Sequence, residues 1–510
     1  MDEMDDKLPG APQIRMELNI LLARSCLRSA PSQAAVLEVV VKGHLNGETL
    51  DGNKIGDRAF PNFIANYSSD VRVNVKSLRK TLKKYYEDEG THDSVIIEIG
   101  EGRNYPVTAS YNPTSDAVKY YQKALAWMGE ESSYPWLIVD ALAFCRCAID
   151  ADPTFAPAYA LYSEYFLCLA TYKQANPVRF GHGPYKGRRE LPECIGLARE
   201  YAIKAVRLNK NSWRAHVAMG AYRACCYMWK AAARSFKKAC ELSFSGTTSD
   251  PWYSFFLIAV GRYDEALKIV EEKSADAPRG SFWNALRPLF LYLCGDLVTA
   301  HLYVRRYPGR NFITMAVEAC LYLARAKYRK VERQWALGLF DEFFHNYRGR
   351  SIGNPIASLG LWALMCGEAG EIDKANQILN SMLSAPRDKQ YEPLYLEHEP
   401  GLGSTREMNE LCENVDYELR RSIENRRQVR CDCPWELGLA FIGAGLHDSA
   451  LMALEQAQKE HHPMMIWLHQ WWFLRPLHKY PKFSELVIKM KLPGWTEDEV
   501  RFAFREIPDY

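Results

Sequence analysis

The sequence predicts a mainly α-helical protein, with a small mixed unit at its N-terminus and a long solenoid of helix pairs behind it. Three observations support this fold class. Residues 12–112 combine helical patterns with one β-hairpin pattern, strand patterns nearly vanish after Pro113, and small residues then recur every 34 positions. The chain of 510 residues, 48% of them hydrophobic, is long enough for more than one core.

Charge and composition limit the functions that the chain can have. The 64 Lys and Arg nearly balance 62 Asp and Glu, so any contact with nucleic acid must come from a local basic patch. The acidic start MDEMDDK lacks the order of a secretory signal, and no apolar run is long enough to span a membrane. We therefore expect a cytoplasmic protein with no membrane contact and an acidic, disordered tail at 1–11. Fourteen Cys without a CxxC pair indicate reduced thiols.

The N-terminal unit is expected at 12–112. Helical patterns cover about 16–28, 32–46 and 51–60, and a fourth helix begins near Ser69 or Asp70 as its N-cap. The segment VIIEIGEGRNYPVTA then predicts a hairpin with strands at 95–99 and 105–109, because Gly100 and Gly102 mark a turn between β-rich runs.

The fourth helix, in SSDVRVNVKSLRKTLKKYY at 68–86, has two contrasting sides. Its apolar residues recur at helical spacing and predict a side that packs on a core; they are Val71, Val75, Leu78 and Leu82. The neighbouring stripe is basic, and its residues are Arg72, Lys76, Arg79 and Lys83, with Lys80 and Lys84 widening it. One side is therefore available for a negatively charged partner.

From 114 to 495 the chain reads as helix after helix with a repeat. Four alanines stand 34 residues apart, at Ala198, Ala232, Ala266 and Ala300. A glycine precedes the alanine by five positions in several units, and these glycines are Gly261, Gly295, Gly370 and Gly445. The Pro- and Gly-containing stretch near 173–192 predicts an inserted loop, and 496–510 is expected to be a tail.

This pattern resembles the tetratricopeptide repeat (TPR), in which two antiparallel helices form each 34-residue unit. The resemblance implies an α-solenoid whose first helices line a concave groove for peptides or partner helices. Counted back from the alanines, the groove residues are Arg214, Val217, Phe255, Phe282 and Leu289. Because they are mainly apolar, we expect an apolar segment of a protein partner, with a small-molecule effector as the alternative. The resemblance also places Trp471 and Trp472 at the end of the array, as a cap.

The N-terminal unit has the element order of a winged helix-turn-helix domain. VRVNVKSLRKTL at 71–82 resembles the recognition helix of OmpR/PhoB-type DNA-binding domains, and IIEIGEGRNYPV stands where that family has its wing. The unit also resembles N-terminal domains joined to TPR arrays in bacterial transcriptional regulators. The resemblance implies that this helix enters the major groove of double-stranded DNA.

The same resemblance assigns residue roles. Arg72, Asn74, Lys76 and Lys80 would face bases and phosphates, with Asn74 best suited to adenine. Arg79 and Lys83 would hold phosphates, and Arg103 is the basic residue of the wing. Ser77, Thr81 and Glu101 depart from the family, because a basic residue would help at each position. A homodimer on two half-sites would compensate for the weaker contacts.

Two other interpretations of the basic helix remain open: contact with a protein, which would make the chain a non-catalytic TPR adaptor, and a merely solvated face. No catalytic motif is present, since GxSxG, HExxH and the GK[ST] loop ending are all missing. His461, His462 and His469 lack the spacing of a metal site. We expect no catalytic residue, metal or cofactor, and hence no enzyme.

Overall fold

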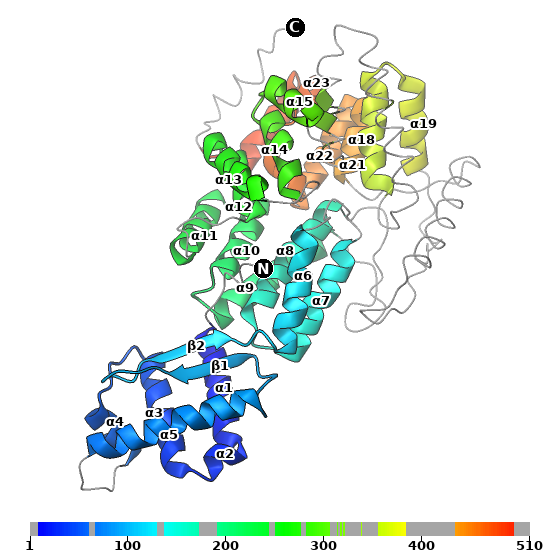
Figure 1. Cartoon of the computed structure of the whole chain (residues 1–510). Coiled ribbons are helices and arrows are strands. Elements are labelled where there is room, and N and C mark those ends of the chain that lie inside the picture. Colours follow the sequence, from blue (N-terminus) through cyan, green and yellow to red (C-terminus); the bar gives the residue numbers. More distant parts are fainter. Residues whose placement is uncertain are drawn as a thin grey trace.

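The computed structural model describes residues 9–60, 67–129, 137–172, 191–243, 250–276, 282–306, 355–383 and 434–493, with a few isolated positions between 314 and 338. It is mainly helical, with one small sheet at the N-terminal end (Figure 1). Most of the acidic tail, nearly all of the inserted loop near 173–192 and the C-terminal tail at 496–510 lie outside the described residues. No described helix is both long and apolar enough to cross a membrane.

The N-terminal unit contains helices followed by an antiparallel hairpin. In chain order its elements are α1 (Ala11–Ala23), α2 (Ser25–Arg28), α3 (Pro31–Leu45), α4 (Gly52–Ala59), α5 (Tyr67–Glu87), β1 (Val95–Ile99) and β2 (Val107–Tyr111). The two strands pair from Val95 with Tyr111 to Ile99 with Val107. The second strand starts two residues later than predicted, because Tyr105 adopts a φ of 45° and Pro106 follows it.

The apolar side of α5 forms the centre of this unit, as predicted. Val71, Val75, Leu78 and Leu82 are all buried. The helix packs on α3, α4 and β1. The periodicity of the sequence therefore identified the buried side of α5.

Behind this unit, consecutive helices pack as antiparallel pairs. The pairs are α6 (Asp116–Gly129) with α7 (Leu137–Ala151), α8 (Ala156–Tyr172) with α9 (Leu191–Leu208), α10 (Trp213–Cys225) with α11 (Trp229–Leu242), α12 (Pro251–Ala259) with α13 (Tyr263–Asp276), α14 (Phe282–Leu293) with α15 (Leu297–Arg306), α18 (Pro355–Glu368) with α19 (Ile372–Leu383), and α21 (Pro434–Gly443) with α22 (His447–Lys459). The first helices α8, α10, α12 and α14 also contact one another in order. This is the arrangement of a TPR-like helical array (Figure 1).

The small residues of the repeat lie where close packing requires them. Ala198, Ala232, Ala266 and Ala300 are fully buried on the second helices of their pairs. The glycines five positions earlier take a positive φ at the turn between the two helices, as at Gly261 with φ 79°. A glycine tolerates this conformation without a steric penalty, which explains the five-residue spacing.

The chain ends in short elements that return to the array. They are η1 (Pro463–Trp467), η2 (Trp472–Leu474), α23 (Arg475–His478) and α24 (Pro481–Met490). The 3-10 helix η1 contacts α8, α10 and α12, which are the first helices of three successive pairs.

The N-terminal unit packs directly on the beginning of the array. A Cβ at Gly10, just before α1, would lie 2.4 Å from the carbonyl oxygen of Leu208 at the end of α9. The ring of Tyr111 meets that of Phe155 edge to face, with centroids 5.0 Å apart. Only glycine allows the backbones of α1 and α9 to approach this closely.

Candidate functional site

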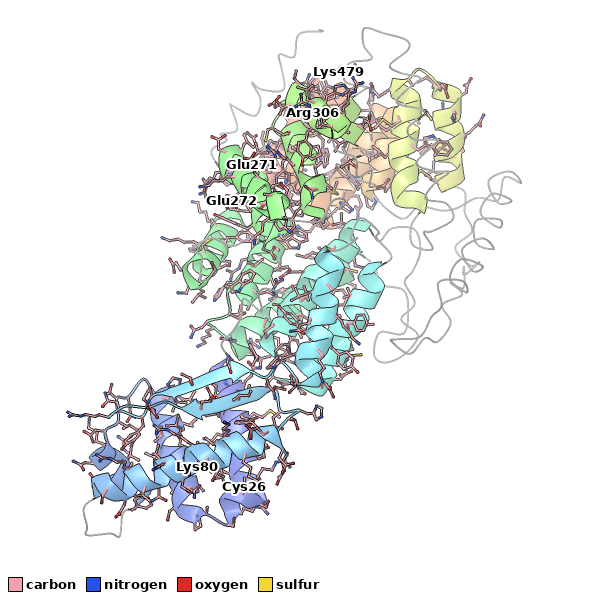
Figure 2. All side chains as sticks on the ribbon, viewed as in Figure 1. Cys26, Lys80, Glu271, Glu272, Arg306 and Lys479 are labelled. Atoms are coloured by element: carbon pink, nitrogen blue, oxygen red, sulfur yellow. The ribbon has the colours of Figure 1, made fainter. Side chains whose placement is uncertain are left out.

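The exposed side of α5 is basic. Arg72, Lys76 and Lys80 are exposed, and none of them forms an ion pair with any residue in the described part of the chain (Figure 2 labels Lys80). Lys83 is exposed and lies 3.8 Å from Glu87, one turn further along the helix. Such an exposed pair contributes little, so Lys83 remains available to a partner.

One apolar side chain interrupts this basic surface. Val73 is 68% exposed beside Arg72, although valine is usually buried. The sequence pattern did not single it out, since Val73 falls outside the apolar stripe of α5. A methyl-bearing side chain among cations can contact a thymine methyl group as well as a protein surface.

Asn74 and Arg79 are held inside the unit and are not free for a partner. The Arg79 guanidinium donates from Nε to the Ile99 carbonyl oxygen at 2.8 Å, and from Nη2 to that of Gly100. The Asn74 amide donates to the Asp70 carbonyl oxygen at 2.9 Å. The expected free phosphate contact of Arg79 is thus corrected: this residue fastens the hairpin to α5. Asn74 would have to break its own bond before it could pair with adenine.

Ser77 and Thr81 stand on α5 where the DNA-binding pattern would have a basic residue, and they have a structural task. Gln33 of α3 donates to the Ser77 hydroxyl at 3.0 Å and accepts from the Thr81 hydroxyl at 2.9 Å. Short hydroxyl side chains fit this contact, whereas Lys or Arg would not. The two departures therefore connect α5 to α3.

The turn of the hairpin lies beyond the point where Arg79 holds it. Glu101 and Arg103 are both exposed in this turn, and Gly102 between them has a φ of 129°. The exposed acidic side chain of Glu101 thus stands in the turn where the DNA-binding family would favour a basic residue.

A buried polar network lies on the inner side of α5. Tyr86 accepts from the Ile97 backbone N–H at 3.0 Å and donates to the Glu17 carboxyl at 2.9 Å. Burial, together with the nearby Asp93 carboxylate, raises the pKa of Glu17 to about 8. The network connects α1, α5 and β1 and so fixes the side of α5 that faces solvent.

Two residues expected in the open groove of the array are part of its packing. Val217 is fully buried. Arg214 is 12% exposed and lies 3.4 Å from Glu164 and 3.7 Å from Asp250, two carboxylates that are almost completely buried. Asp250 also caps α12 by accepting from the Trp252 backbone N–H at 2.8 Å. The prediction that Arg214 and Val217 line an open groove was wrong, since Val217 is buried and Arg214 lies between carboxylates of α8 and of the residue that caps α12.

The remaining groove surface is occupied by the chain itself. Phe255 is half-buried and meets the Trp467 ring edge to face, with centroids 5.1 Å apart. The Trp467 indole N–H donates to the Phe255 carbonyl oxygen at 3.1 Å, and Gln470 donates to that of Ile258 at 2.7 Å. Phe282, whose ring lies 6.3 Å from that of Phe255, and Leu289 are half-buried nearby. The apolar segment expected from a partner is thus supplied by η1.

The two tryptophans expected to cap the array differ in environment. Trp471 is buried inside the molecule, with its ring 6.5 Å from Tyr292 and 6.3 Å from Trp435. Trp472 is half-buried beneath the guanidinium of Arg475. Trp471 therefore belongs to the core between the C-terminal segment and the array.

The histidines near the C-terminus serve packing. The ring of His462 is fully buried and stacks on Trp435, with centroids 5.8 Å apart, and its Nδ1 accepts from the Met464 backbone N–H at 3.2 Å. Burial lowers the pKa of His462 to about 3, so the ring is neutral. Among the described residues, no three His, Cys, Asp or Glu side chains gather in a way that could hold a metal ion.

No protein-family model and no curated protein matches the sequence. Among solved structures, the chain is similar to human IFIT1, in a dimer with PPP-AAAA, at 14% identity over 90% of this chain and 95% of that chain, with a TM-score of 0.33. It is also similar to the TPR domain of P58(IPK), at 11% identity over 76% of this chain and 96% of that chain, with a TM-score of 0.19. Both TM-scores are too low to establish a shared fold, so the repeat assignment rests on the helix pairing and the 34-residue period.

Proposed function

We propose that this chain is a non-enzymatic transcriptional regulator whose N-terminal unit is an OmpR/PhoB-type winged helix that binds double-stranded DNA. The exposed basic side of α5 carries this proposal: Arg72, Lys76 and Lys80 face solvent without an acidic partner among the described residues. The hairpin that Arg79 holds against α5 would serve as the wing.

The side chains available on α5 suit binding to the DNA backbone better than base reading. Arg72, Lys76, Lys80 and Lys83 would neutralise phosphates, while Val73 would touch a thymine methyl group in the major groove. About four such contacts give a slope of about −4 when log affinity is plotted against log salt. Dimerisation on two half-sites would supply the affinity that one unit with an acidic wing residue lacks.

The test is a mobility-shift titration of the full chain with fragments of genomic DNA from its source organism. The double variant Lys76→Glu/Lys80→Glu should lose at least about 10-fold in affinity, because two phosphate contacts become repulsive. Arg15→Glu/Lys119→Glu, with the same charge change at exposed positions off α5, is the matched control and should bind as wild type does. Equal affinity of both double variants would contradict the proposal.

A second candidate function is that of an adaptor. The engagement of Asn74 and Arg79 within the unit favours it, because Asn74 would otherwise be the side chain best suited to adenine and Arg79 would otherwise be free to hold a phosphate. In this case Val73 and the surrounding cations would contact an acidic protein, and the array would present further partner surfaces. Wild-type protein that binds no duplex even at low salt would support the adaptor and exclude the regulator.

A further inference from the structure

A second basic surface lies on the array itself. Residues 191–243 contain ten Lys or Arg but only three Glu, in a chain whose net charge is +2. The next pair has the opposite balance, with six acidic and three basic residues in 250–276, among them Glu271 and Glu272 on α13 (Figure 2). We call the exposed cations of the first stretch the α9–α11 basic face; they are Arg199, Lys204, Arg207, Lys210, Lys230, Arg234, Lys237 and Lys238.

The cations of this face have few acidic neighbours. Lys238 lies 3.4 Å from Glu241, and no other member forms an ion pair with a residue that the structure describes. Burial and then the charge of Arg234 lower the pKa of Arg223 on α10. Lys238 likewise adds to the effect of burial in lowering the pKa of His216. An anionic partner would neutralise this local excess of positive charge.

The chemistry of the face fits a phosphate backbone. Among the described side chains of 191–243, every large hydrophobic one is buried or half-buried except that of Met228, which precedes α11 and is 41% exposed. One exposed methionine does not form an apolar cluster. A protein interface would need apolar or aromatic anchors at its centre, whereas contact with phosphates needs only Lys and Arg. An acidic protein is therefore the less suitable occupant.

The position of the face connects it with the N-terminal unit. The α1 helix of that unit packs on α9, where Gly10 approaches Leu208. Figure 1 shows α9 beside the N-terminal unit and α11 farther along the same array. A duplex of about 40 base pairs is roughly 136 Å long, so DNA of this length extends well beyond the segment that α5 would contact.

We propose that the α9–α11 basic face is a second binding site for duplex DNA, which holds the phosphate backbone flanking the segment bound by α5. This inference rests on the proposed function of the N-terminal unit. The contact is independent of sequence and increases both affinity and salt dependence on long DNA.

The experiment compares two lengths of duplex with the full chain. One duplex of about 12 base pairs covers little more than a helical turn, and the other of about 40 base pairs contains the same sequence at one end. Arg234→Glu/Lys237→Glu should bind the short duplex as wild type does and lose roughly 10-fold in affinity for the long one, with a salt slope smaller by about 2. Lys268→Glu/Lys482→Glu, an equal charge change at exposed positions on α13 and α24, should behave as wild type does.

The outcomes separate this inference from the function on which it rests. Wild-type binding to both duplexes, with Arg234→Glu/Lys237→Glu unchanged on the long one, overturns the second site and leaves DNA binding by α5 intact. Wild type that binds neither duplex overturns both proposals. If Arg234→Glu/Lys237→Glu also lost affinity for the short duplex, the face would not be a separate site for flanking DNA.

Discussion

Replacing Trp467 by alanine should detach the C-terminal segment from the groove of the array. The Trp467 side chain is 5% exposed, and its ring packs against Phe255 at 5.1 Å and Trp471 at 6.0 Å. Removing a buried tryptophan typically costs about 3–5 kcal/mol of unfolding free energy. The lost indole bond to the Phe255 carbonyl oxygen, worth about 1 kcal/mol, is part of that cost. We expect a loss of about 4 kcal/mol.

The measurement is urea denaturation combined with hydrogen exchange of the amides in 463–474, because repeat arrays do not always unfold in one step. Trp467→Ala should lower the midpoint and speed exchange in this segment. Trp467→Phe keeps an aromatic ring and should cost about 1–2 kcal/mol. Trp472→Ala, at the half-buried neighbouring site, is the control and should change exchange in η1 little. A loss below about 1 kcal/mol for Trp467→Ala would refute the placement of η1 in the core.

Two further predictions concern the same region. The pKa of His462 is lowered to about 3 by burial, so its contribution to stability is complete above the ordinary histidine pKa of about 6.5 and is lost as pH falls from there toward 3. Relative to His462→Gln, wild type should lose about 2 kcal/mol between pH 7.5 and 5 in paired denaturation series, and a constant difference would contradict the burial of a neutral ring. Tyr227 has a φ of 58° at the turn where other pairs have glycine. Tyr227→Gly should therefore be about 1 kcal/mol more stable than Tyr227→Ala by urea denaturation, and equal stability would argue against the left-handed turn.

The sequence predicted those parts of the fold that depend on local periodicity. The buried side of α5 and the positions of Ala198 and Ala232 follow from spacing along one helix or one repeat. Glycine five positions before the repeat alanine is not required in every unit, because Tyr227 adopts the same left-handed conformation at the turn before Ala232. The Tyr227 hydroxyl donates to the Gln458 carbonyl oxygen at 3.5 Å and its ring lies 5.3 Å from that of His461, contacts that glycine could not make.

The occupied groove could not be predicted in this way. Trp467 and Phe255 are 212 positions apart, and no period relates η1 to α12. Arg79 illustrates the same limit at short range. Its place on the helical wheel predicts exposure, but β1 ends beside it, and the carbonyl oxygens of Ile99 and Gly100 accept hydrogen bonds from its guanidinium. The role of a side chain between two elements depends on both of them. The periodicity of one helix carries no information about the strand that packs beside it.

The filled groove changes where a partner of this array must be sought. The first helices of a TPR-like array are expected to line its groove, and here η1 packs on the first helices α8, α10 and α12. A partner that used this surface would first have to remove Trp467 at the cost worked out above, which is about as large as the free energy of a millimolar complex. The outer surfaces carry no such cost. The exposed cations of α5 and of the α9–α11 basic face do not lie on the helices that η1 covers, so both basic surfaces can bind an anionic partner without displacing Trp467.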